Sequence, residues 1–257
     1  MITFDIDPQR RLATATLARP PVNGMNAAWL DRFDQVIAEV EATPGLAALR
    51  IRSACKVFSA GGDLAFMRDN LGTQEGRAAL VQHVARCQRA FARLAGLPLV
   101  TVAQVGGHAL GGGFELALAC DFRLLAEDVQ VALPEATVGL IPGAGGTQRV
   151  AELAGQAIAR RVVLTGRRID SATALAWNLC DAVHPVDALD AATLAFCREL
   201  SPLSSTAIAQ AKRCLAVAGG GTEEGYAREI EAIAAQFADA DTRARIAAFF
   251  ADKPAPR

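Results

Sequence analysis

The sequence has almost no net charge, since 26 basic residues are balanced by 27 acidic residues within 257. Proteins that bind nucleic acid or an anionic membrane through their surface usually carry a basic excess, so neither partner is expected here. A secretory signal is not expected either, because the first residues, MITFDIDPQRR, contain no apolar stretch of the required kind. These features favour a cytoplasmic protein.

Long apolar runs, paired cysteines and clustered histidines are missing as well. The most apolar region, Leu94 to Cys120, is interrupted by Gln104, His108 and Glu115, which argues against a membrane span. Six cysteines form no C-x-x-C pair, and reduced, buried thiols are the simplest interpretation. The three histidines are scattered, so we expect no zinc or other metal site.

The remaining composition, with 52% hydrophobic residues, is that of a globular chain long enough for one large domain or a domain with an appendage. Segments rich in β-forming residues flank the turn DPQR and predict a hairpin near the amino terminus. Apolar residues at helical spacing predict helices over 27–41 and 77–94. After the second of these helices, the segment LPLVTVAQV is typical of a strand buried on both faces.

The second half of the sequence is mostly helical. Short strands are predicted at residues 122–125 and 129–133, and from Gly145 onward helical patterns dominate. The segment LTGRRID is expected to be a loop, and DAVHPVDAL a strand followed by a turn. We therefore predict an α/β core followed by a helical tail.

The segment HALGGGFELALACD, residues 108–121, is unusual for a core helix. Three glycines, Gly111 to Gly113, remove every side chain from a bend, and Glu115 then places one carboxylate among apolar neighbours. Backbone N–H groups at the start of a helix are free to bind, and the helix dipole adds positive potential there. The glycines would let such N–H groups approach a ligand closely.

A second glycine bend occurs in KVFSAGGDLAFM. Here Gly61 and Gly62 follow a strand-like segment, and Asp63 is a candidate helix N-cap. Two N–H donors aimed at one point would stabilise a developing oxyanion. The glycines could also serve packing alone, because they permit close approach of elements.

A second carboxylate lies in LPEATVGLIPGAGGTQR, where Glu135 follows a strand and PGAGG forms another wall without side chains. Two carboxylates in one apolar site can divide into an acid and a base, because burial raises one pKa more than the other. Taken separately, Glu115 could be a partner of the helix dipole and Glu135 a surface residue. The separation of Glu115 and Glu135 in the sequence does not show whether the two carboxylates meet in the folded chain.

The motifs RPPVNGMN, FSAGGDL, GGHALGGGFELALACD and LPEATVGLIPGAGGTQR, in this order, closely resemble the crotonase superfamily, the enoyl-CoA hydratases and isomerases. The resemblance covers nearly the whole chain. It implies a spiral of ββα turns with the active site in residues 1–200, and a helical region in 201–257 for oligomerisation and closure of the acyl pocket. It also implies an acyl-CoA thioester substrate, no cofactor beyond that coenzyme A, and a homotrimer or a hexamer made of two trimers.

The resemblance also implies roles for particular residues. Glu115 matches the glutamate that activates water, and Glu135 the one that delivers a proton to the α-carbon. The backbone N–H groups of Gly62 and Gly112 match the oxyanion hole, and Gly143 a backbone position that helps hold the water. Contacts with the substrate and its coenzyme A would fall on Lys56, Ala60, Gly61, Asp63 and Leu64.

Some positions depart from the family pattern or are weakly supported. Ala60 would lie beside the adenine and Lys56 near the phosphates, although a lone lysine is also typical of a solvated surface. Gly62 replaces a small side chain found in many relatives, which leaves a backbone donor intact. Leu133 stands where some hydratases have a polar residue, and the tail DKPAPR lacks the terminal aromatic that many members carry.

The expected activity is reversible hydration of trans-2-enoyl-CoA thioesters to 3-hydroxyacyl-CoA. The presence of both Glu115 and Glu135 favours a hydratase over a double-bond isomerase, which generally lacks the first acid. Decarboxylase, dehalogenase and thioester hydrolase activities stay open, because one fold hosts many chemistries. A silent coenzyme A binder or an RNA-binding relative fits less well, given both glutamates and the balanced charge.

Overall fold

The computed structural model describes residues 1–218 and 222–251. The chain divides into two compact units, Met1–Ser201 and Pro202–Arg257. The boundary expected from the sequence, after residue 200, differs by one position. The roles expected for the second region, oligomerisation and closure of the acyl pocket, stay predictions, and the Gly219–Gly221 run and the DKPAPR tail lie outside the described residues.

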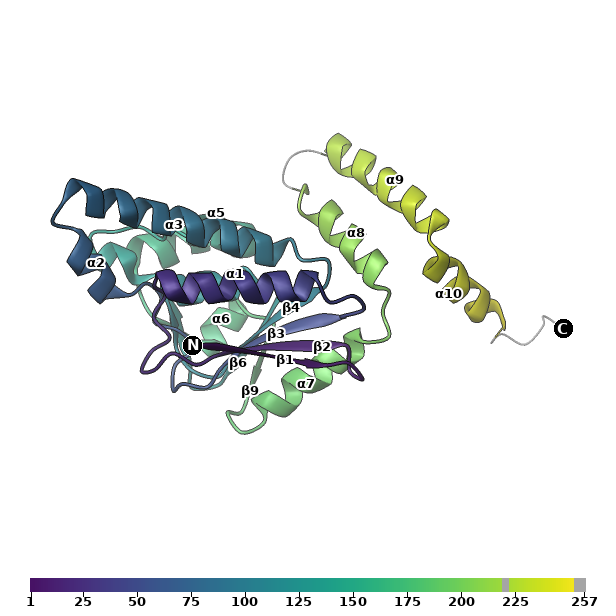
Figure 1. Ribbon diagram of the computed structural model, residues 1–257, viewed down its shortest axis with the longest axis horizontal. Helices are drawn as coiled ribbons and strands as arrows, with labels where there is room; N and C mark the ends of the chain where they lie inside the picture. Colours follow the sequence, from purple (N-terminus) through teal and green to yellow (C-terminus); the bar gives the residue numbers. More distant parts are fainter. Residues whose placement is uncertain (219–221, 252–257) are drawn as a thin grey trace. The chain divides into compact units, whose positions relative to one another are not determined.

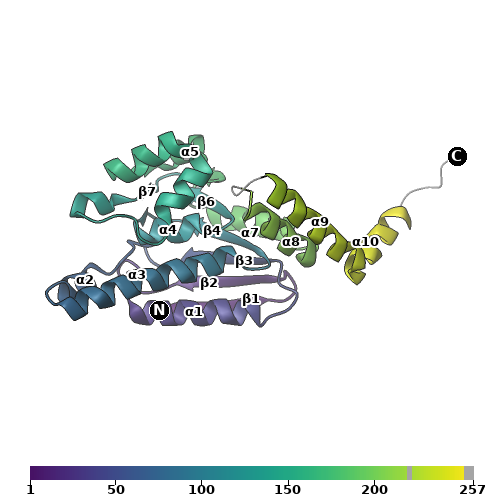
Figure 2. The same ribbon diagram turned by 90° about the horizontal axis from the view of Figure 1, so that it is seen from above.

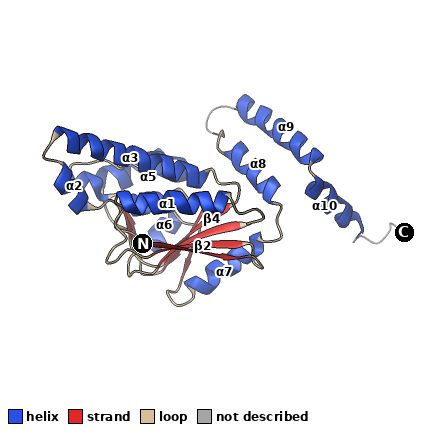
Figure 3. Ribbon diagram, in the orientation of Figure 1, coloured by secondary structure: helices blue, strands red, loops and turns tan. Residues whose placement is uncertain are grey.

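The first unit is built on a six-stranded sheet with the strand order β1-β2-β3-β4-β6-β9 (Figures 1 and 3). Its strands are β1 (Ile2–Asp7), β2 (Leu12–Leu17), β3 (Ala48–Ser53), β4 (Val100–Val105), β6 (Phe122–Ala126) and β9 (Ala182–His184). Strand β1 pairs antiparallel with β2, which confirms the predicted hairpin, and all other pairs in this sheet are parallel. Every residue of the central strand β4 is buried, as expected for a parallel strand covered on both faces.

A smaller sheet contains β5 (Ala109–Leu110), β7 (Gln130–Ala132) and β8 (Ile169–Asp170), in the order β5-β7-β8. The expectation that LTGRRID is a loop is therefore wrong at both ends, because Leu164 and Thr165 close the helix α5 (Gly146–Thr165) and Ile169 and Asp170 form β8. Ile169 lies opposite Val131 in an antiparallel pair, so the last two residues complete the edge of this sheet. Two residues of strand are too few to produce a recognisable alternation in the sequence.

The helices of the first unit confirm the predicted α/β class. They are α1 (Ala27–Glu41), α2 (Leu64–Asn70), α3 (Gln74–Ala95), α4 (Gly112–Leu118), the 3₁₀ helix η1 (Pro134–Val138), α5 (Gly146–Thr165), α6 (Ser171–Ala176) and α7 (Leu189–Leu200). Helices α1 and α3 lie on one side of the six-stranded sheet and α7 on the opposite side (Figures 1 and 3). Parallel strands covered by helices on both faces are typical of α/β proteins.

Aromatic packing joins α1 to α3, which lie side by side in both views (Figures 1 and 2). Asn26 caps α1 by accepting a hydrogen bond from the Trp29 N–H, so the helix begins where the apolar face begins. The rings of Trp29 and Phe33 stack at 5.0 Å, and Phe33 meets Phe91 of α3 edge to face at 6.1 Å. This contact holds α3 in place, and the neighbouring turns of α3 form one wall of the pocket described below.

The second unit consists of helices α8 (Ser205–Leu215), α9 (Thr222–Ala238) and α10 (Ala240–Ala251). Helix α9 packs against both α8 and α10. Large apolar side chains on these helices remain exposed, including Tyr226, Phe237 and Phe249.

Candidate active site

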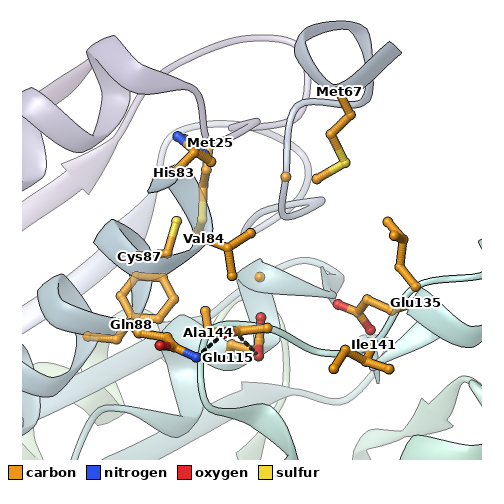
Figure 4. A pocket seen from close by; sticks show the side chains of 15 residues that line it. Met25, Met67, His83, Val84, Cys87, Gln88, Glu115, Glu135, Ile141 and Ala144 are labelled. Carbon is orange, nitrogen blue, oxygen red and sulfur yellow. Dashed lines mark hydrogen bonds between the residues drawn. The ribbon is translucent and has the colours of Figure 1, made fainter. Parts of the chain in front are cut away.

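A pocket of about 360 Å³ opens between α3, the start of α4 and the segment after η1 (Figure 4). Its walls are mostly apolar and include Met25, Met67, Val84 and Ile141. The charged side chains on its wall are the carboxylates of Glu115 and Glu135, both directed into the same hollow (Figure 4). An apolar cavity with a few convergent polar groups is the usual form of a small-molecule site.

Glu115 projects from α4 and is 3% exposed. Its Oε1 atom accepts hydrogen bonds from the backbone N–H groups of Ala144 and Gly146, each at 2.8 Å. A Cβ atom at position 146 would lie 3.0 Å from this oxygen, so glycine there allows the backbone to reach the carboxylate. Both bonds engage the same oxygen, Oε1, and the residue lines the pocket.

Glu135 lies in the first turn of η1 and reaches the pocket from the other side. Its Oε1 atom would lie 2.8 Å from a Cβ atom at Gly111, so the glycine bend makes room for this carboxylate. Its Oε2 atom is buried and has no hydrogen-bond partner among the described residues. A buried oxygen without a partner is costly unless a ligand or a proton satisfies it.

The two carboxylates differ in their electrostatic surroundings. Burial raises the pKa of Glu115, while its two N–H donors and the Arg149 guanidinium oppose this rise. Burial, with the neighbouring charge of Glu115, raises the pKa of Glu135 to about 7. The group with donors and a nearby cation is better suited to the ionised form, and the group without them to the protonated form.

The two glycine bends meet at this pocket, which Gly62 and Gly112 both line. A Cβ atom at Gly112 would lie 3.6 Å from the Gly62 nitrogen, so the two proposed oxyanion donors belong to adjacent backbones. Neither N–H donates a backbone hydrogen bond within the described part of the chain. Gly111 has a φ of 52° and Gly61 a φ of 86°, which favour glycine at both bends. Two free N–H groups beside two carboxylates can bind a carbonyl oxygen.

Replacing Gly61 with alanine is expected to lower the free energy of unfolding by about 1–3 kcal/mol. The new Cβ atom would lie 2.6 Å from the Gly112 nitrogen, and the φ of 86° disfavours any side chain. Thermal or urea unfolding would measure the loss. Gly72→Ala is the matched control, because a Cβ atom there meets nothing within 4 Å; equal stability of both variants would contradict this account of the bend.

The structure brings five of the predicted site residues together, since Glu115, Glu135, Gly62, Gly112 and Gly143 all line the pocket. The five predicted contacts with substrate and coenzyme A do not line it. Among these five, Asp63 is the N-cap of α2 as expected, and it also pairs with Arg19 at 2.8 Å. Their roles stay predictions: Lys56, Ala60, Gly61, Asp63 and Leu64.

Helix α3 provides a wall of the pocket that was not predicted from the sequence. Val84, Cys87, Gln88 and Phe91 recur at helical spacing and line the pocket, together with His83. Burial raises the pKa of the Cys87 thiol to about 12 and lowers the pKa of His83, so both side chains favour their neutral forms. The spacing was visible in the sequence, but an apolar helical stripe normally indicates core packing, and nothing marked this one as the wall of a cavity.

The family model for enoyl-CoA hydratase/isomerase matches residues 7–255. The chain belongs to this family. The membership confirms the predicted resemblance to the crotonase superfamily and places the chain among enzymes that process acyl-CoA compounds.

Individual relatives support the same assignment. The Mycobacterium bovis protein named "Probable enoyl-CoA hydratase echA8" is 31% identical over 257 residues, covering 99% of this chain and 97% of the relative. The structure of Pseudomonas aeruginosa DspI matches with a TM-score of 0.90 at 32% identity, over 100% of this chain and 96% of that one. A Thermobifida fusca protein described as a candidate enoyl-CoA hydratase, solved in complex with CoA, matches with a TM-score of 0.80 at 33% identity, over 92% and 93%. These likenesses confirm the crotonase-type α/β fold.

None of the helices within residues 1–218 and 222–251 is long and apolar enough to span a membrane. In the same residues, no cluster of three or more His, Cys, Asp or Glu side chains could hold a metal ion.

Proposed function

We propose that this protein hydrates trans-2-enoyl-CoA thioesters reversibly to 3-hydroxyacyl-CoA, in the role of an enoyl-CoA hydratase. The observation that carries the proposal is the pairing of Glu115 and Glu135 in one pocket, next to two free backbone N–H groups. A double-bond isomerase needs a single acid/base. The additional buried carboxylate, that of Glu115, is held by two N–H donors, and hydration gives it a use because a further proton must be moved.

The chemical step follows from this arrangement. The thioester oxygen accepts hydrogen bonds from the N–H groups of Gly62 and Gly112, which stabilise the negative charge that develops during addition. Glu115, ionised, takes one proton from water while the water oxygen forms a bond to the β-carbon. Glu135, protonated, gives its proton to the α-carbon as the double bond is lost. The elements of water are thereby added across the double bond, and turnover is completed when Glu115 releases its new proton to solvent and Glu135 takes one up. Reversal of the same steps dehydrates the product.

A coenzyme A thioester substrate is supported by the family and by the CoA complex of the Thermobifida fusca relative. Lys56 and Ala60 are both exposed, which suits contacts with the phosphates and the adenine. Assembly into a trimer or a hexamer, a location in the cytoplasm, a role in fatty acid β-oxidation and the lack of any further cofactor belong to the same proposal.

A direct assay tests the reaction type. A panel of trans-2-enoyl-CoA thioesters of increasing length is mixed with the protein, and loss of the conjugated absorbance is followed. Rapid loss with any member, with 3-hydroxyacyl-CoA as the product, is the expected result. If none reacts but β,γ-enoyl thioesters gain conjugation, the protein is an isomerase and the hydratase proposal fails.

Gly112→Pro is expected to lower kcat by about 10²–10³-fold, because it deletes one oxyanion donor. Position 112 is the first residue of α4, where proline is tolerated by a helix. Gly112→Ala keeps the N–H, and its Cβ atom would meet the Gly61 Cα atom and the Met25 sulfur at an ordinary 3.5 Å. Steady-state kinetics should show a far smaller loss for alanine than for proline; equal losses in folded proteins would rule the donor out.

A further inference from the structure

One of the backbone groups that donate to Glu115 is itself held by a further hydrogen bond. The Ala144 N–H that donates to Glu115 belongs to the same peptide group as the Gly143 carbonyl. That carbonyl accepts a hydrogen bond from Nε2 of Gln88 at 2.6 Å. A continuous chain therefore runs from the Gln88 amide through one peptide group to the carboxylate, and Figure 4 shows its members on one wall of the pocket.

We propose that Gln88 of α3 is a positioning residue for Glu115, holding the Gly143–Ala144 peptide so that its N–H points at the carboxylate. The proposal rests on the hydratase mechanism for its kinetic consequences. It concerns a residue for which neither composition nor motif suggested a role, and one that reaches Glu115 only through the backbone of another segment.

The segment that contains the Gly143–Ala144 peptide requires interactions that fix its backbone conformation. It lies in the sequence PGAGG, whose glycines allow many backbone conformations, so rotation of one peptide could turn the N–H away from Glu115. The following carbonyl, of Ala144, is held separately by Arg149 at 2.9 Å. Gln88 and Arg149 thus fix two successive peptide groups from two different helices, α3 and α5. An amide bonded to the carbonyl also polarises the peptide and strengthens its N–H donor.

The charged and titratable groups around Glu115 set the direction of the effect. Arg149 faces it from α5, Cys87 from α3 and Glu135 from η1. The Ala144 N–H is one of the interactions that lower the pKa of Glu115 against the rise caused by burial. Losing the Gln88 bond weakens that donor, so the pKa of Glu115 should rise further and less of it should be ionised at a given pH.

Gln88→Met tests the inference, because methionine keeps the length and the apolar contacts of the side chain but cannot donate. We expect kcat to fall about tenfold with KM nearly unchanged, and the acid limb of the kcat profile to move up by about half to one pH unit. Gln82→Met is the matched control, since Gln82 is an exposed glutamine of the same helix that does not line the pocket. A change in KM alone, or an unmoved acid limb, would reduce Gln88 to a wall residue and overturn the proposal.

A second measurement separates this inference from the proposed function. The Glu115 carboxyl resonance in protein labelled with ¹³C at glutamate, assigned by its loss in Glu115→Gln, is titrated in the wild type and in Gln88→Met without substrate. A higher pKa in the variant supports the positioning role even if no enoyl thioester is hydrated. An identical pKa overturns the role even if hydration is fast.

Discussion

Replacing Glu115 with glutamine is expected to lower kcat for hydration by about 10²–10⁴-fold. The amide keeps a carbonyl oxygen that can accept the Ala144 and Gly146 N–H bonds, so the loop should stay in place. It cannot take a proton from water, and the step that makes water nucleophilic is lost. Steady-state and single-turnover kinetics would measure the loss of the chemical step.

The control for Glu115→Gln is coenzyme A affinity, measured by titration calorimetry. Glu115 contacts the loop 144–146 and no residue predicted to bind the nucleotide, so we expect the affinity to be unchanged. Unfolding should also show no large loss of stability, since the substitution removes a buried charge without emptying its space. Full hydration activity in a folded Glu115→Gln protein would contradict the role of this residue as the base.

Glu135→Gln is expected to cause a loss of similar size, about 10²–10⁴-fold, for a different reason. The carboxyl has a pKa of about 7, so near neutrality a large fraction carries the proton that the α-carbon needs. An amide has no proton of comparable acidity to give. Hydration and the exchange of the α-hydrogen with solvent, both followed by NMR, should fall together.

The pH dependence gives Glu135→Gln a distinctive control. Hydration uses the protonated carboxyl, so wild-type kcat/KM should fall as the pH rises through about 7. The reaction takes up no net proton, so the ratio of the two kcat/KM values cannot depend on pH, and kcat/KM for dehydration should fall over the same range. Both limbs should vanish from the residual activity of Glu135→Gln. A variant that keeps the wild-type limbs would show that another group, and not Glu135, delivers the proton.

Much of the fold could be predicted because its signals are local. The helix over 27–41 has the bounds predicted for it, since its N-cap, Asn26, and its apolar stripe both lie within the segment. The hairpin and the buried strand β4 have equally local patterns. The edge strand β8 was missed because its two residues are ordered by pairing with β7, a segment almost forty residues away.

The candidate site also combines residues that could be predicted from the sequence with contacts that could not. Gly112, Glu115 and Glu135 could be proposed because the motifs that carry them, in this order, resemble those of the crotonase superfamily. What the sequence could not show is how the parts meet. The approach of Gly146 to Glu115, the reach of Gln88 to Gly143 and the unpartnered oxygen of Glu135 all depend on tertiary contacts between separate segments.

The most direct test of two-carboxylate hydration is the product formed from a short trans-2-enoyl-CoA in D₂O, observed by NMR. The account predicts a 3-hydroxyacyl-CoA with one deuterium at the α-carbon, formed by the wild type and almost absent with Glu115→Gln or Glu135→Gln. Deuterium at the γ-carbon without a β-hydroxyl, or hydration that persists in both variants, would contradict it.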